Sequence, residues 1–277
     1  MTRTQKHGGL RSRIAVGASA VAVAATIWGV TALVTTDGDA GRPAGSQSRT
    51  DDGPAGSGPS AGSSAGSPSG IPETIAHLSE AGGDAVNITI DDGPDPRWTP
   101  QVLDALARHG AKATFCMIGP QAKAHPDLVK RVVAAGHRLC DHSMTHDTGM
   151  DKKPVAYQRA QILDAKKLIE EAAGGGAKVE YYRAPGGAFT PDSRRIAAAA
   201  GMRPLGWNVD TKDFAKPGAA AIVDTVKREI GNGPTLLFHD GGGDRRQTVI
   251  ALDQVLTWLK EQGRPTGFPI RTAPESP

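Results

Sequence analysis

The chain has 277 residues, 35 of them glycine and 20 proline, and a formal net charge of +3. Four of its cations lie within the first 13 residues, so the remainder is close to −1, and this balance gives no support to nucleic-acid binding. Because Phe, Tyr and Trp make up only 4% of the chain, it has no aromatic-rich accessory module that would bind glycans.

The first 34 residues predict export. Residues 1–13 form a basic flank that should stay cytoplasmic, and residues 14–34 are an uncharged apolar run. That run can cross a hydrocarbon core of about 30 Å at about 1.5 Å per residue. It is longer than the apolar region of about 7–15 residues in a cleavable signal peptide. We therefore expect an uncleaved signal anchor in the cell membrane, with an extracellular domain; the alternative is a cleaved signal peptide and a secreted protein.

Residues 35–70 predict a flexible linker. They are dominated by Gly, Ser, Ala, Pro and Asp and lack both aromatic residues and apolar periodicity. Such a segment cannot bury enough surface to offset the entropy of ordering it. The globular part therefore comprises residues 71–277, and we expect it to be a monomer.

From residue 71 onward, short apolar runs alternate with amphipathic segments. Strands are predicted at residues 85–90, 113–118, 137–141, 178–183, 203–207 and 235–239, with a last apolar run at 268–270. Helices are predicted at residues 100–109, 126–135, 155–173, 191–200, 218–230 and 248–262. Six or seven strands that alternate with helices indicate an α/β fold with a mainly parallel sheet.

Polar residues fall at or just beyond the carboxyl ends of these predicted strands. They are Asp91, Asp92, Asp141, His142, Arg183, Asp210 and His239. In a (β/α) barrel, the carboxyl ends of the strands form the rim on which active sites are built. This distribution favours a closed or nearly closed barrel over the alternative, a doubly wound open sheet.

Asp91 and Asp92 are adjacent carboxylates at the end of a β-branched run, so they raise each other's pKa unless a cation or a donor compensates. His142 and His146 lie four residues apart after another strand. Two imidazoles and one carboxylate form a metal site with open positions, whereas a pair of surface or core histidines is the alternative. The spacing does not decide which aspartate is the ligand and which a general base.

Three further side chains can support acid–base chemistry at this rim. Arg183 can supply the compensating cation, unless it is a solvated surface residue. Asp210 and Asp213 can orient a histidine or the arginine, unless they cap helices. His239 ends a wholly apolar strand, and as an imidazolium held by an acid it can protonate a leaving amine.

Cys116 and Cys140 are the only cysteines, and both lie on predicted consecutive parallel strands. Neighbouring strands are about 4.8 Å apart, and an exported protein can keep a disulfide. We therefore expect a bridge between them; two buried free thiols are the alternative.

Five motifs follow one another at the ends of the predicted strands. They are Thr89-Ile90-Asp91-Asp92-Gly93-Pro94, His142-Ser143-x-x-His146, Arg183-x-Pro185-x-Gly187, Asp210-x-x-Asp213-Phe214 and Leu237-x-His239. In this order they resemble the motifs of the polysaccharide deacetylases, carbohydrate esterase family 4 with its NodB-homology domain. The resemblance spans about residues 85–263.

The resemblance implies a deformed (β/α) barrel that removes N-acetyl or O-acetyl groups from carbohydrate with bound zinc, or another divalent ion such as cobalt. It makes Asp91 the base, and Asp92, His142 and His146 the metal ligands. Arg183 then positions the base, and His239 is an acid tuned by Asp213. The implied substrate-binding residues are Pro185, Gly187, Phe214 and Leu237. Two positions depart from the family pattern: Ile90 stands where Phe is common, and Phe214 where Trp is common.

On this basis we expect a hydrolase that deacetylates an N-acetylglucosamine polymer of the cell wall, with peptidoglycan as the leading substrate. A secreted enzyme acting on chitin oligomers or acetylxylan is the alternative. A third possibility is a non-catalytic carbohydrate-binding relic, but the intact acid, base and metal-binding residues argue against it.

Overall fold

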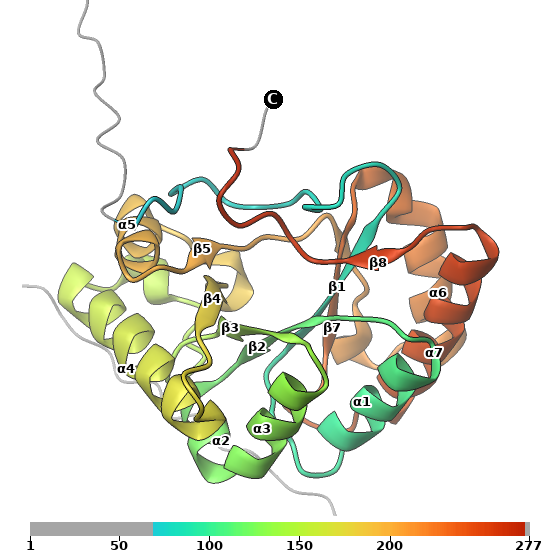
Figure 1. Ribbon diagram of the computed structural model, residues 1–277, viewed down its shortest axis with the longest axis horizontal. Coiled ribbons are helices and arrows are strands. Elements are labelled where there is room, and N and C mark those ends of the chain that lie inside the picture. The colour runs from blue at the N-terminus through green and yellow to red at the C-terminus, as the bar shows by residue number, and fades with distance from the viewer. Residues whose placement is uncertain (1–68, 275–277) are drawn as a thin grey trace, which may run out of the picture. The chain divides into compact units, whose positions relative to one another are not determined.

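The computed structural model of the protein describes residues 69–274, which form a curled eight-stranded sheet with helices around it (Figure 1). The strand order is β5-β4-β3-β2-β1-β7-β6, with β8 paired to β1. All pairings between these strands are parallel. The curled parallel sheet agrees with the predicted deformed (β/α) barrel rather than with a flat doubly wound sheet.

The bounds of the elements are as follows. The strands are β1 (Val86–Asp91), β2 (Thr114–Met117), β3 (Arg138–Asp141), β4 (Val179–Tyr182), β5 (Arg203–Pro204), β6 (Val209–Asp210), β7 (Thr235–His239) and β8 (Thr266–Gly267). The helices are α1 (Thr99–Arg108), α2 (Gly119–Ala124), α3 (Pro126–Ala134), α4 (Val155–Ala173), α5 (Pro191–Ala199), α6 (Ala219–Glu229) and α7 (Arg246–Glu261). Short 3₁₀ turns include Pro185–Gly187 and Asp213–Ala215.

The predicted basic flank, the apolar run 14–34 and nearly all of the linker lie outside the described residues. Within residues 69–274, no helix is both long enough and apolar enough to cross a membrane.

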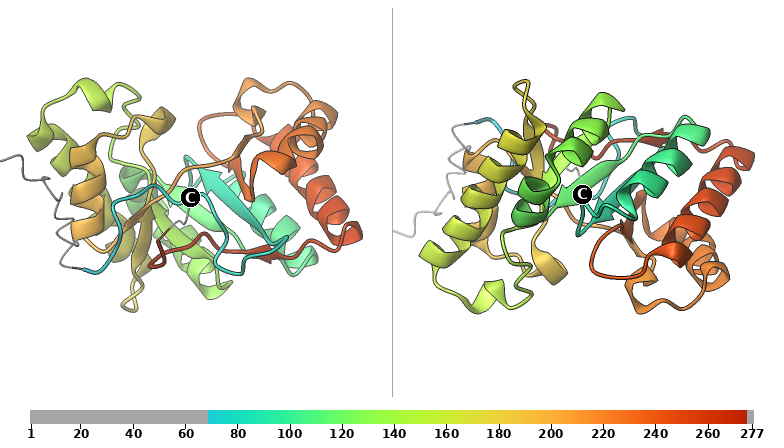
Figure 2. Two further views of the ribbon diagram at one scale, coloured as in Figure 1. Left: turned by 90° about the horizontal axis from the view of Figure 1, so that it is seen from above. Right: turned by 90° about the horizontal axis from the view of Figure 1, so that it is seen from below.

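The two faces of the sheet differ in chemistry because side chains alternate along each strand. On β1, Val86, Ile88 and Ile90 belong to the main apolar core. The residues between and after them, Asn87, Thr89 and Asp91, are polar and face the opposite side of the sheet. Helices lie around the outside of the curled sheet, with α4 and α5 at one end and α6 and α7 at the other (Figure 2). The outer face is therefore the apolar packing surface, and the inner face carries the polar side chains.

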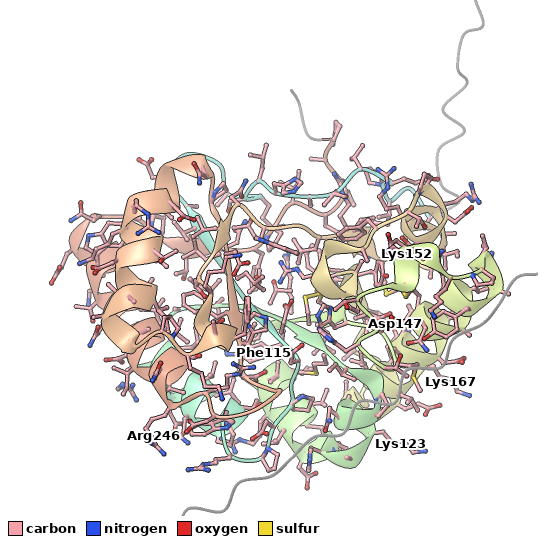
Figure 3. The ribbon with its side chains drawn as sticks, turned by 180° about the vertical axis from the view of Figure 1, so that it is seen from behind. Phe115, Lys123, Asp147, Lys152, Lys167 and Arg246 are labelled. Atoms are coloured by element: carbon pink, nitrogen blue, oxygen red, sulfur yellow. A yellow bond between two sulfur atoms is a disulfide. The ribbon has the colours of Figure 1, made fainter. Side chains whose placement is uncertain are left out.

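On the outer side of the sheet, side chains between the strands and the helices are buried, and those on the far side of the helices are exposed. Phe115 of β2 lies inside the fold, whereas Lys123 of α2 and Lys167 of α4 project from the surface (Figure 3). The inner face also holds the two cysteines, which stand opposite each other in the register of β2 and β3. The structure joins them in a disulfide with an S–S distance of 2.18 Å.

Four elements differ from the sequence prediction. The strand expected at 203–207 is limited to two residues, and β6 was not predicted as a strand. The last strand is Thr266–Gly267, just before the apolar run at 268–270. Helix α2 was not predicted, because Gly119–Ala124 is too short and too polar to display an apolar period. The sheet therefore has eight strands rather than six or seven.

The two ends of the described region meet at a buried arginine. The side chain of Arg203 has no exposed surface. Its Nε donates to the carbonyl of Thr74 at 2.8 Å, and its Nη1 donates to the carbonyl of Ala273 at 2.9 Å. Beside it, Ala76 pairs with Leu205, so the segment before β1 extends the sheet next to β5.

Candidate active site

Asp91 ends β1 on the inner face and is only 2% exposed. The fully buried guanidinium of Arg183 donates from Nη1 to Asp91 Oδ1 at 2.7 Å and to the hydroxyl of Thr89 at 2.8 Å. Its Nε and Nη2 donate to the carbonyls of Leu205 and Gly206 at 3.2 and 2.8 Å. A buried carboxylate needs such a charged and hydrogen-bonded partner. Arg183 therefore fixes one oxygen of Asp91, and the other oxygen faces the metal-ligand candidates.

Asp92, His142 and His146 form a compact cluster of potential metal ligands. One donor atom from each lies within 4.8 Å of the others. Asp92 Oδ1 is 3.3 Å from His146 Nε2 and 3.7 Å from His142 Nε2. This carboxylate oxygen is buried and accepts no hydrogen bond from residues 69–274, a costly state that a cation would relieve.

The orientation of His142 also fits a metal ligand. Its Nδ1 lies 2.8 Å from the carbonyl oxygen of Arg183 and must donate a hydrogen bond to it. Nε2, on the side of Asp92, therefore carries the lone pair that can bind a metal ion. Burial lowers the pKa of His142 despite the nearby charges of Asp91 and Asp92, so the ring favours the neutral form that binds metal. Two imidazoles and one carboxylate fit a catalytic divalent ion such as zinc.

The loops that present these ligands have unusual backbone geometry. Asp92, Ser143 and His146 have φ values of +78°, +68° and +52°, in the left-handed region that disfavours non-glycine residues. The loop after β3 is held by its own side chains, because Ser143 N donates to Asp141 Oδ1 at 2.7 Å and His146 N donates to Ser143 Oγ at 3.2 Å. Such conformations cost on the order of 1–3 kcal/mol each and are characteristic of functional loops.

His239 ends β7 beside β1 and is held by one carboxylate. Its Nδ1 lies 2.6 Å from Asp213 Oδ1, and its backbone N–H donates to Asp213 Oδ2 at 2.9 Å. Thr248 of α7 donates to the same Oδ2 at 2.8 Å. Burial lowers the pKa of His239, but the hydrogen bond and charge of Asp213 outweigh it and raise the pKa overall. Burial conversely raises the pKa of Asp213, and its donors outweigh that effect and lower it.

These groups share one cavity of about 340 Å³ at the carboxyl ends of the strands. Its lining comprises Asp91, Asp92, His142, His146, Thr148, Ala184, Gly186, Trp207, Asp210, Phe214, Leu237 and His239. The ring centroids of Phe214 and His239 are 5.6 Å apart, and Phe214 is 46% exposed. The cavity therefore brings together a buried carboxylate, a cluster of metal-ligand candidates, a carboxylate-bound histidine and an apolar wall.

Three sequence-predicted residues have different positions from those expected. Asp210 lines the cavity but accepts a hydrogen bond from Lys212 Nζ at 2.7 Å, so it orients neither a histidine nor Arg183. Pro185 is buried and is not part of the cavity lining, and Gly187 lines a neighbouring cavity instead.

Asp240 is a buried carboxylate beside the site, behind the turn that carries Asp92, and it was not predicted from the sequence. Its side chain is fully buried, and Oδ2 accepts a hydrogen bond from the hydroxyl of Thr99 at 2.6 Å. A Cβ on Gly93 would lie 2.2 Å from Asp240 Oδ1, so Gly93 allows this carboxylate to lie against the Asp91–Pro94 turn. Burial raises the pKa of Asp240 to about 7. Its position directly after His239, before three successive glycines, was the available signal.

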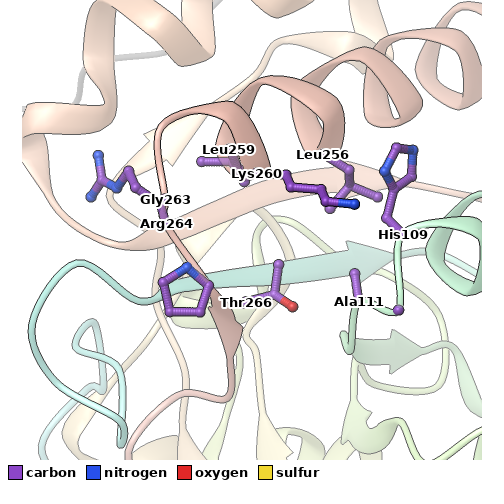
Figure 4. Close-up of a pocket in the computed structure, with 10 residues that line it drawn as sticks. His109, Ala111, Leu256, Leu259, Lys260, Gly263, Arg264 and Thr266 are labelled. Carbon is purple, nitrogen blue, oxygen red and sulfur yellow. The ribbon is translucent and has the colours of Figure 1, made fainter.

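A larger cavity of about 430 Å³ lies at the other end of the strands (Figure 4). Ala111 precedes β2 and Thr266 begins β8, so this cavity opens at the amino ends of the strands. It contains none of the metal-ligand candidates, and Leu256 and Leu259 of α7 are among its lining residues. Of these two cavities, the smaller one therefore contains the metal-ligand candidates.

Comparisons with known proteins agree with the motif analysis. A family described as polysaccharide deacetylase matches residues 79–205. A chitooligosaccharide deacetylase of Sinorhizobium fredii is 38% identical over 210 residues, which cover 72% of this chain and 94% of the relative. A peptidoglycan-N-acetylglucosamine deacetylase of Bacillus cereus is 40% identical over 180 residues, which cover 64% of this chain and 83% of the relative.

Solved structures give the same relationship. A peptidoglycan N-acetylglucosamine deacetylase aligns with a TM-score of 0.65 and 29% identity, over 70% of this chain and 90% of that one. A family 4 carbohydrate esterase from Streptomyces lividans in complex with acetate aligns with a TM-score of 0.60 and 32% identity, over 66% of this chain and 92% of that one. A family 4 pseudoenzyme from Bacillus anthracis aligns with a TM-score of 0.65 and 29% identity, over 71% of this chain and 68% of that one.

Proposed function

Because the chain belongs to the polysaccharide deacetylase family, we propose that it removes N-acetyl groups from an N-acetylglucosamine polymer in a metal-dependent reaction, with peptidoglycan as the substrate. One observation carries the proposal. The Arg183-bound Asp91, the Asp92/His142/His146 cluster and the Asp213-bound His239 all face one cavity.

Asp92, His142 and His146 would hold the divalent ion. When bound, such an ion polarises the acetyl carbonyl and lowers the pKa of a water, and zinc or cobalt suits this donor set. The remaining chemistry belongs to the side chains around it.

Asp91 acts as the general base. One of its oxygens is occupied by Arg183, and the other lies 3.5 Å from His142 Nε2, on the side of the metal ligands. It is therefore placed to take a proton from the attacking water, while Arg183 keeps the carboxylate oriented.

His239 acts as the general acid. With Nδ1 directed at Asp213, its Nε2 remains to protonate the leaving amine nitrogen as the amide C–N bond breaks. The raised pKa of His239 favours the protonated form that this step consumes. Phe214 and Leu237 supply apolar wall for the acetyl methyl group.

Two substrate classes are supported by relatives. The peptidoglycan deacetylase relative favours a cell-wall substrate, and the predicted anchor would keep the domain near the wall: about 36 linker residues span about 30–36 Å on average. The chitooligosaccharide deacetylase relative favours short chitin oligomers as the second candidate.

A substrate panel tests the proposal. Acetate release is measured from peptidoglycan, chitin oligomers and acetylxylan, with and without a chelator. We expect the highest kcat/KM on peptidoglycan, and loss of activity with the chelator that added zinc or cobalt restores. Release from acetylxylan alone would contradict the N-acetyl assignment. No release from any substrate would favour the non-catalytic relic.

A further inference from the structure

The loop that carries both histidines of the metal-ligand cluster has a hydrogen-bond acceptor for each backbone N–H. It comprises residues 142–146, and we call it the metal-ligand loop. His142 N donates to the carbonyl of Met117 at 2.8 Å. Ser143 N donates to Asp141 Oδ1, and His146 N donates to Ser143 Oγ. These three acceptors come from β2, β3 and the loop itself, so the other two N–H groups need an acceptor from elsewhere.

Gln161 of α4 supplies that acceptor. Its Oε1 accepts from Met144 N at 3.2 Å, from Thr145 N at 3.0 Å and from the Thr145 hydroxyl at 2.9 Å. Because backbone N–H groups can only donate, the oxygen of the amide must face the loop. Gln161 therefore binds the two residues that lie just before His146.

The burial of Gln161 is unusual for a helix face that packs against a sheet. Its side chain is 8% exposed, although such a face is normally apolar. A buried amide costs free energy unless it is hydrogen-bonded. The buried residues of α4 are two glutamines near its amino end followed by aliphatic residues, namely Gln158, Gln161, Ile162, Ala165, Ile169, Ala172 and Ala173. The donors of the loop satisfy Gln161 in this buried position.

A second side chain of α4 binds the chain just after the metal-ligand loop. Tyr157 lies four residues before Gln161 and therefore on the same face of the helix. Its hydroxyl donates to Asp147 Oδ2 at 3.1 Å. Asp147 Oδ1 in turn accepts from Gly149 N at 2.9 Å. Helix α4 thus holds the backbone on both sides of His146.

Helix α2 binds the same loop from its first residue. Gly119 N donates to the carbonyl of Ser143 at 3.0 Å. A Cβ on Gly119 would lie 2.8 Å from the Cα of Ala165 in α4, so the two helices are in direct contact there. They lie side by side next to the sheet (Figure 1). Together they form one support for the metal-ligand loop.

The conformation that this support holds is an unfavourable one. Ser143 and His146 have φ values of +68° and +52°, in the region that disfavours residues other than glycine. Such conformations persist only where the surrounding contacts over-determine them. The two residues bound by Gln161 lie between these two positions. Without Gln161, we expect the loop to relax and His146 Nε2 to leave its position 3.3 Å from Asp92 Oδ1.

We propose that Gln161 is a positioning residue for the metal: it holds the metal-ligand loop in the binding conformation before the ion arrives. Ligands that are already ordered lose less conformational entropy on binding, so the affinity for the ion is higher. This inference rests on the proposed function, because it takes the cluster to be a metal site. Gln161 itself contributes no ligand atom to the cluster.

The test measures the Kd for zinc of the metal-free protein by competition with a chromophoric chelator. Wild type is compared with Gln161→Met, Gln161→Glu and the matched control Gln158→Met. Gln158 is a 3% exposed glutamine one turn earlier on α4. It donates to the carbonyl of Lys153 at 2.9 Å and accepts from the hydroxyl of Thr190 at 2.6 Å, both outside the metal-ligand loop. Both methionine variants should lower the melting temperature, but only one should change metal binding.

Gln161→Met should weaken zinc binding by about 10–100-fold, because methionine has the length of glutamine but no strong acceptor. Gln161→Glu keeps an acceptor oxygen in either protonation state and should bind zinc as wild type does. Gln158→Met should also retain the wild-type Kd. The visible spectrum of bound cobalt reports the arrangement of the ligands, so it should change in Gln161→Met alone.

Two outcomes would overturn the role of Gln161. One is a wild-type Kd and cobalt spectrum in Gln161→Met. The other is equal weakening in Gln158→Met, which would indicate general damage to α4. If Gln161→Met does not fold, Thr145→Val decides, because it removes one exposed donor to Gln161. This variant should weaken zinc binding by about 2–10-fold, and an unchanged Kd would overturn the inference.

The binding measurement also separates this inference from the proposed function, because it involves no turnover. A wild type that binds zinc through His146, with weaker binding in Gln161→Met, supports the inference even if it releases no acetate. A wild type that binds no zinc contradicts both. Normal acetate release together with an unchanged Kd in Gln161→Met overturns the inference alone.

Discussion

Asp213 binds His239 twice, through the ring Nδ1 at 2.6 Å and through the backbone N–H at 2.9 Å. One carboxylate therefore sets both the orientation of the imidazole and the position of the strand end that carries it. The buried negative charge also favours the imidazolium, because the pKa of His239 is raised overall. These two roles can be separated by experiment.

Asp213→Asn should move the alkaline limb of the kcat/KM profile to lower pH. The proposed mechanism requires the acid form of His239, and the raised pKa of His239 keeps that form present to higher pH. Without the Asp213 charge the pKa falls, so activity is lost earlier as pH rises. The profile is measured between pH 5 and 10, with the exposed Asp224→Asn as the control. An unshifted limb would show that another group limits the rate.

Asp91→Asn should lower kcat by at least about 100-fold while the protein still binds its metal. The amide cannot take a proton from water, whereas Asp92, His142 and His146 are unchanged. Acetate release and metal content are measured on the same preparation. Asp210→Asn is the matched control, because Asp210 lines the same cavity but is paired with Lys212. Near-normal turnover by Asp91→Asn would remove Asp91 from the role of base.

Metal addition should stabilise the metal-free protein, and this effect should depend on the cluster. At a free zinc concentration about 100 times the Kd, binding adds about 2.7 kcal/mol to the free energy of unfolding. His146→Ala should lose most of this gain, because its Nε2 lies 3.3 Å from Asp92 Oδ1. His125→Ala, at the start of α3 and outside the cluster, should retain it. Equal stabilisation of both variants would place the metal elsewhere.

Asp240→Asn should stabilise the metal-free protein more at pH 8 than at pH 5. Burial raises the pKa of Asp240 to about 7 in the folded state, above its unfolded value of 3.8. The associated stability is complete below pH 3.8 and is lost as pH rises through about 7, because the buried carboxylate must ionise. Between pH 5 and 8 the variant should gain about 2–3 kcal/mol relative to wild type. Chemical denaturation at both pH values measures this, and a pH-independent difference would contradict it.

Much of the fold was accessible from the sequence because its signals are local. The amphipathic period and the terminal Gly and Pro residues gave the bounds of α4 correctly and those of α1 and α3 within one residue. Strands β5 and β6 have two residues each, too few for a period of two to be visible. Their place in the sheet is set by hydrogen bonds to β4 and β7, which are tertiary interactions.

The site was predictable to a similar extent. Charged residues at strand ends predicted the neighbourhood of Asp92, His142 and His146, because parallel strands end at the same edge. Asp240 was missed, since its burial depends on the close approach of Gly93, which lies in a turn far away in sequence. Trp207 was missed as well, because no local pattern shows that its indole faces two cavities.

Arg203 has a consequence for any shortened version of this protein. Its buried guanidinium is bound by carbonyls from Thr74 on one side and Ala273 on the other. A fragment cut at the matched family boundary, residue 79, would leave that charge without its upstream partner. It would also remove Ala76 from a small buried cluster whose other members are Cys116, Cys140, Tyr181, Leu205 and Ile270. A buried hydrogen-bonding group that loses its partner costs about 1–3 kcal/mol, and more when it is charged. The smallest piece that folds independently should therefore extend beyond the recognisable family region at both ends, from about residue 69 to about residue 273.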